Sequence, residues 1–262
     1  MYNEMLDAVN YAAKKKLAVL GDRYWKYLLS SAFAGSYIGI GMILIFTIGG
    51  YMAGSPAVKT IMGLSFAVAL CLVIFTKTDL FTGNTFVMTI GWLSKTVRLI
   101  DLVKIWLTSY CGNFIGAMLL SLIFVGSGLV NGTHTMEYFG LMAFAKANGT
   151  FFEILCRGIL CNVMVCLAMM ITYRTKDEVA KILMTFMCLF VFITSGFEHS
   201  IANMTVYGVS LMAGIDGVTV GHALHNIIPA TIGNIIGGGL IIGGGSYLLK
   251  SSDYRPNPEN HS

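Results

Sequence analysis

A titratable side chain interrupts a long apolar run in the second half of the chain. Residues 195–203 bring Glu198, His199 and Asn203 between apolar segments on both sides. A charged group at membrane depth costs about 2.5–3.5 kcal/mol, so such side chains usually face a cavity or a partner. A free imidazole titrates near pH 6.5 and exchanges protons at physiological pH. We therefore expect His199 to take part in proton transfer.

A second interruption, at 77–84, divides another apolar run and supplies the hydroxyl of Thr82. The backbone N–H groups freed where a half-helix begins favour anions. Lys77 and Asp79 are close enough in sequence to neutralise each other. Together the two interruptions predict a polar centre inside an apolar bundle.

Each of these residues also has a purely structural interpretation. His199 can bond Asn203 and fix a helix break, and Thr82 can cap the half-helix that follows it. Lys146 can concentrate anions at an entrance or be a solvated loop lysine. A carboxylate beside an anion path would repel its cargo, so we expect Glu198 to tie its loop to backbone N–H groups.

The composition predicts a membrane protein. Of the 262 residues, 56% are hydrophobic and 11% charged, against about a quarter charged in a soluble domain. Most Lys and Arg residues flank apolar segments on one side, which predicts cytoplasmic termini and needs no nucleic acid to explain the net charge. The six cysteines lie in apolar runs without metal-ligand spacing, so we expect no disulfide, metal or cofactor site.

The hydropathy pattern predicts three parts: a cytoplasmic amphipathic helix over 1–26, a transmembrane domain over 27–250, and a polar, disordered cytoplasmic tail over 251–262. Six transmembrane helices are expected in the transmembrane domain, at about 27–53, 57–92, 102–128, 150–173, 179–213 and 222–249. The second and fifth are too long for one span and too short for two, so we expect them to be broken. A polar loop is expected over 131–148.

The six segments divide into two groups of three. The third member of each group carries a Gly-Asn-x-Ile-Gly motif, at 112–116 and at 233–237. Because three spans is an odd number, the second group enters the membrane from the opposite side. The pattern predicts an inverted repeat whose two broken helices meet near the midplane.

Four linked motifs resemble the formate–nitrite transporter family. They are Leu80-Phe81-Thr82-Gly83-Asn84, residues 158–162 with 165–168, residues 196–204, and residues 226–238. The resemblance implies an all-α, aquaporin-like, six-helix protomer with its own pore, in a homopentamer and without enzymatic activity. It is nearest to the nitrite and hydrosulfide branches, and it implies a bacterial inner membrane or plasma membrane location.

The resemblance also assigns residues by position. It places Thr82, His199, Asn162 and Asn203 at the pore centre; Phe66, Leu80 and Phe192 in an outer constriction; Leu70, Phe81 and Val165 in an inner one; and Lys146 as the periplasmic lysine that attracts anions. Residues 80–83 resemble a gating loop that works with the N-terminal helix. Asp79 stands where many members have Glu, which leaves the anchoring of that loop open.

These observations predict passage of a small monovalent weak-acid anion such as formate, nitrite or hydrosulfide. A proton moving from or through His199 would let the neutral acid cross between the two apolar rings. The alternative is an aquaporin-like channel for neutral small solutes. That class is expected to carry paired Asn-Pro-Ala breaks, which this sequence lacks.

Overall fold

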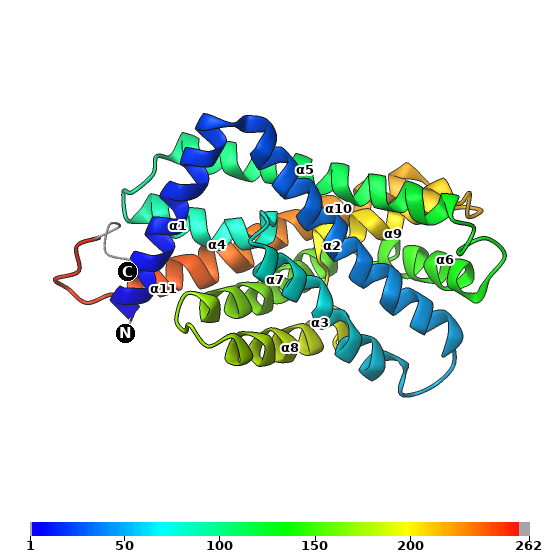
Figure 1. Ribbon diagram of the computed structural model, residues 1–262. Coiled ribbons are helices and arrows are strands. Elements are labelled where there is room, and N and C mark those ends of the chain that lie inside the picture. The colour runs from blue at the N-terminus through cyan, green and yellow to red at the C-terminus, as the bar shows by residue number, and fades with distance from the viewer. Residues whose placement is uncertain (1, 257–262) are drawn as a thin grey trace.

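The computed structural model describes residues 2–256, and every regular element in that range is helical. Long helices lie side by side, with α1 across one end of the bundle and α6 at the other (Figure 1). The elements are α1 (Tyr2–Asp22), α2 (Tyr24–Tyr51), α3 (Val58–Thr76), α4 (Phe81–Leu93), α5 (Leu99–Gly126), α6 (His134–Ala147), α7 (Phe151–Thr172), α8 (Glu178–Thr194), α9 (Ser200–Met212), α10 (Val220–Ile235), the π-helix η1 (Ile236–Gly244) and α11 (Gly245–Leu248). The all-α prediction is confirmed for the described part.

Five helices are long and apolar enough to cross a membrane. They are α2, α3, α5, α7 and the continuous run Val220–Leu248. Helix α8 has 17 residues and α9 has 13, which makes both short for an independent span of about 20 residues. The chain is a multi-pass membrane protein.

Both expected interruptions are present. Helix α3 ends at Thr76 and α4 begins at Phe81, while α8 ends at Thr194 and α9 begins at Ser200. Lys77 and Gly196 adopt positive φ angles of 55° and 74°, a left-handed conformation that stops each helix. We call residues 77–80 the first break and residues 195–199 the second break.

The expectation of a loop over 131–148 is wrong. Most of that stretch forms α6, which starts where the Thr133 hydroxyl accepts a hydrogen bond from the Met136 amide. Phe139 and Ala143 lie four residues apart and are buried against the bundle. Packing of this face against the bundle stabilises the helix, which the polar residues of the stretch do not predict.

The two described ends of the chain lie together at one end of the bundle (Figure 1). The Asn3 side chain bonds Ser251, and the Tyr254 hydroxyl donates to Asp7. The expected disorder of the tail is therefore wrong for residues 251–256, because these contacts fix it on α1. Residues 257–262 of the expected tail lie outside the described residues.

Candidate functional site

His199 and Thr82 join the two breaks at the centre of the bundle. The His199 Nε2 atom lies 3.1 Å from Thr82 Oγ1, and both side chains are buried. His199 is the N-cap of α9, and Thr82 lies in the first turn of α4. Two segments 117 residues apart thus place a titratable ring beside a hydroxyl.

The hydrogen bonds of His199 define its neutral tautomer. Its Nδ1 atom accepts from the Ala202 amide at 3.1 Å, so Nδ1 carries no proton in that state. The ring proton therefore lies on Nε2 and is donated to the Thr82 hydroxyl. A second proton at Nδ1 would break the cap on Ala202, so the charge of His199 is coupled to the start of α9.

The ten apolar and polar residues assigned to the pore centre and constrictions are all buried. Around the centre, the Phe192 ring stacks on His199 at 6.0 Å, and the Phe66 ring meets Phe192 edge-on at 5.4 Å. Leu80 precedes α4 in the first break. Phe81, of the expected inner set, packs edge-on against Tyr110 at 4.9 Å.

Asn162 and Asn203 contact the protein rather than open space. The Asn162 amide donates to the Thr82 carbonyl at 3.2 Å, to Thr85 at 2.9 Å and to the Asn234 carbonyl at 2.6 Å. It therefore positions the turn of α4 that holds Thr82. Asn203 donates to Glu198 Oε2 and to Asn226 Oδ1, both at 2.6 Å. The His199 side chain does not bond the Asn203 side chain; it caps α9 through the Ala202 amide, and the Asn203 amide donates to the His199 carbonyl at 2.9 Å.

The asparagine of each Gly-Asn-x-Ile-Gly motif anchors one break. Asn113 accepts from the Phe81 amide at 2.8 Å and donates to the Asp79 carbonyl at 3.0 Å. Asn234 does the same to the second break, accepting from Ser200 at 2.9 Å and donating to the Glu198 carbonyl at 2.9 Å. Breaks expose backbone groups that need partners at membrane depth, and these two side chains supply them.

The same asparagines also bond the first helix of their own group of three. Asn113 donates to the Ser31 carbonyl at 2.7 Å on α2, and Asn234 to the Gly158 carbonyl at 2.8 Å on α7. The flanking motif glycines lie against those helices: a Cβ on Gly116 would overlap the Ala32 carbonyl, and one on Gly237 the Ile159 carbonyl. Both motifs thus combine close helix approach with anchoring of a break.

The acidic residue of each break is paired with a lysine. Glu198 Oε2 accepts from Lys146 Nζ at 2.9 Å and from Asn203, so side chains hold it, not the backbone N–H groups expected. Asp79 accepts from Lys16 and from Ser30, so it is Lys16 of α1, and not Lys77, that pairs with it. Sequence reasoning missed Lys16 because 63 residues separate the partners.

Lys16 and Asp79 also line a cavity. Its volume is about 830 Å³, and it opens among α1, the first break and the α7–α8 connection. Burial lowers the pKa of Lys16, but the attraction to Asp79, the nearby Tyr173 and the hydrogen bond to Asp79 together raise the pKa above its ordinary value. The raised pKa keeps Lys16 charged at neutral pH. The stability that its pair with Asp79 contributes is therefore lost only when the pH rises through the pKa of Lys16 in the folded protein.

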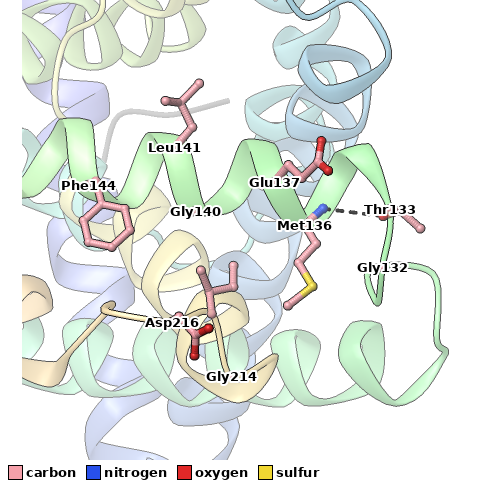
Figure 2. Close-up of a pocket in the computed structure, with 10 residues that line it drawn as sticks. Gly132, Thr133, Met136, Glu137, Gly140, Leu141, Phe144, Gly214 and Asp216 are labelled. Atoms are coloured by element: carbon pink, nitrogen blue, oxygen red, sulfur yellow. Dashed lines mark hydrogen bonds between the residues drawn. The ribbon is translucent and has the colours of Figure 1, made fainter.

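Another cavity, about 490 Å³, lies between α6 and residues 214–216 (Figure 2). None of the ten residues that line it belongs to either break or to the predicted site. It is therefore separate from the centre described above.

The Lys146–Glu198 pair gives a stability prediction. In a Glu198→Gln variant the Lys146 ammonium, whose side chain is only 17% exposed, loses its carboxylate. We expect the free energy of unfolding in detergent to fall by about 3 kcal/mol. Lys146→Met combined with Glu198→Gln should recover part of it. Glu137→Gln is the control. Glu137 lies on α6, as Lys146 does, and its pair with His134 is exposed and contributes little. A loss in the control as large as in Glu198→Gln would contradict this.

Comparisons with known proteins agree with this architecture. The model of the family described as "Formate/nitrite transporter" matches residues 3–248. The chain is 35% identical over 235 residues to the nitrite transporter NirC of Salmonella typhimurium, covering 88% of this chain and 86% of that one.

Two solved structures are also similar. One, titled "FNT family ion channel", is 31% identical with a TM-score of 0.89, covering 94% of this chain and 99% of that one. The other, a pentameric formate channel with formate bound, is 26% identical with a TM-score of 0.76, covering 86% and 96%. Fold, motifs and relatives agree, and the chain belongs to the formate/nitrite transporter family.

Proposed function

We propose that this chain forms a homopentameric channel for small monovalent weak-acid anions, with one pore in each protomer and His199 as its proton-transferring residue. The observation that carries the proposal is the His199–Thr82 contact at 3.1 Å, which joins both breaks. Relatives named as a nitrite transporter and a pentameric formate channel support the cargo class and the assembly.

The proposed topology has six spans in two inverted repeats. Helices α3 with α4, and α8 with α9, each form one broken span. The matching contacts of Asn113 and Asn234 support the repeat, since each bonds a break and the first helix of its group. The inversion is supported by α1 and α6, which lie at opposite ends of the bundle and hold the acids of the first and second break (Figure 1). We propose that the protein lies in the plasma membrane, with α1 and the C-terminal tail on the cytoplasmic side.

The proposed proton step uses both ring nitrogens of His199. A bare anion crossing the apolar rings would lose its hydration at a cost of several kcal/mol. The Nε2–H proton passes to the anion, directly or through the Thr82 hydroxyl, while Nδ1 takes up a replacement proton from the external water that enters with the anion. The neutral acid then crosses the constrictions and releases its proton on the far side. Protonation of Nδ1 breaks its hydrogen bond with the Ala202 amide, and that bond forms again when the ring returns to its first tautomer.

Lys146 remains our proposed anion-attracting residue at the α6 end. Its ammonium has three N–H donors and one is used by Glu198, so two are available to an arriving anion. The pair is neutral overall, which allows an anion to be attracted without being trapped.

Stopped-flow flux in proteoliposomes tests the proposal. Formate, nitrite and hydrosulfide are measured in parallel, with water and glycerol as neutral solutes, and protein-free liposomes as the control. We expect anion uptake to exceed the control and to rise as external pH falls, because proton supply assists entry. Faster water or glycerol equilibration without anion flux would instead support the neutral-solute channel.

A further inference from the structure

The described C-terminal segment makes a set of polar contacts with α1 that the transport site does not explain. The Asn3 side chain donates to Ser251 Oγ at 2.6 Å and accepts from the Ser251 amide at 3.2 Å. The Tyr254 hydroxyl donates to Asp7 Oδ1 at 2.8 Å and accepts from Asn10 Nδ2 at 3.2 Å. We call these contacts the C-terminal latch.

The latch residues of α1 are spaced to share one helix face. Asn3, Asp7 and Asn10 are four and three residues apart, which aligns them along α1. Met5 and Val9 lie on another face and pack into the cluster that includes Phe86 and Ile90 of α4. The C-terminal segment therefore binds a polar face of α1, which differs from the apolar face that packs against the bundle.

Asn10 connects the latch to the bundle. It is fully buried, and its Nδ2 atom donates to Ser94 Oγ at the end of α4 as well as to Tyr254. A buried amide with two partners on different elements fixes the rotation of α1 about its axis. The latch thus holds tail, α1 and α4 at one point.

Lys16 lies on the same continuous helix, less than two turns beyond Asn10. It pairs with Asp79 in the first break, whose next residues, Leu80 and Phe81, are buried. Because a helix turns as a unit, the contacts that fix Asn10 also fix where the Lys16 ammonium reaches. The α1 face near Lys16 also walls the 830 Å³ cavity before the break.

We infer that Tyr254 is a positioning residue for the pore: through α1 it holds Lys16 on Asp79, and so keeps the first break in place with Leu80 buried. This inference rests on the proposed channel function. Loss of the Tyr254 hydroxyl removes both of its hydrogen bonds to α1, so α1 can shift. The first break, which includes Leu80 and adjoins Phe81 of α4, then loosens.

The test compares Tyr254→Phe, Lys16→Met and the double variant in pentamers reconstituted into liposomes. Tyr254→Phe should raise the initial anion flux about threefold, the population shift expected from losing hydrogen bonds of ordinary strength. Lys16→Met should raise it at least as much, and Tyr254→Phe should add nothing in that background. Tyr247→Phe, which removes a phenol that no described contact places on α1, should leave flux unchanged.

Hydrogen exchange gives a readout that does not depend on transport. Amides of residues 2–22 should exchange faster in Tyr254→Phe and in Asn3→Ala, but not in Tyr247→Phe. Asn3→Ala removes the other half of the latch and serves if Tyr254→Phe assembles poorly. Unchanged exchange and flux in both variants would overturn the inference, as would an equal gain in the Lys16→Met background. Absence of anion flux in the wild-type protein would refute the channel and leave the exchange result to decide on the latch.

Discussion

Replacing His199 with asparagine is expected to lower the anion flux at neutral pH about a hundredfold, the low end for a lost proton-transfer group, and to remove the dependence of uptake on external pH. The asparagine amide oxygen can take the place of Nδ1 as acceptor for the Ala202 amide, and asparagine is an accepted N-cap, so α9 should still begin at Ser200. What it lacks is a titratable nitrogen.

The measurement is the initial rate of formate or nitrite entry into proteoliposomes at several external pH values. His134→Asn is the matched control, because that imidazole is exposed at the start of α6 and its side chain is 71% accessible. The control should keep the wild-type profile. An unchanged pH profile in His199→Asn would contradict proton transfer through the ring.

Replacing Asn234 with alanine is expected to lower the free energy of unfolding by about 3 kcal/mol or more. The side chain satisfies the Ser200 amide and the carbonyls of Glu198 and Gly158, all in a buried region. Each buried group left without a partner costs about 1–3 kcal/mol, and water is scarce at this depth. Relaxation around the smaller side chain recovers only part.

The proposed repeat predicts a similar loss for Asn113→Ala. That side chain makes the corresponding three bonds, to the Phe81 amide and to the carbonyls of Asp79 and Ser31. Denaturant titration of the detergent-solubilised protein measures both. Asn148→Ala at the end of α6 is the control and should change stability little, because Asn148 makes no buried side-chain bond among those described. If Asn113→Ala behaved like the control while Asn234→Ala did not, the two halves would not be equivalent.

The two breaks were predictable because polar and charged residues at membrane depth are energetically costly and therefore mark a special local structure. The apolar runs on either side and the glycines within are visible without coordinates, and they located the ends of α3 and α8 to within a few residues. The burial of His199 follows from the same pattern. The resemblance to a known family added which apolar residues surround it.

Partners far apart in the sequence were not predictable. Lys77 was the nearest cation to Asp79, but the left-handed turn at Lys77 ends α3, and Lys16 of α1 reaches the carboxylate instead. The loop expected over 131–148 failed for a related reason. Its helix depends on burying Phe139 and Ala143 against other elements, which composition does not record.

The interruption at 195–203 shows where the division lies. By itself the sequence determined that this protein is a membrane-embedded helical bundle with a titratable group at a helix break, because the cost of burying charge makes such a residue conspicuous. Only the tertiary structure decided that His199 faces Thr82, that Asn234 anchors its loop and that Lys146 neutralises Glu198. Hydrogen bonds act over about 3 Å, and chain topology alone brings such distant residues within that range.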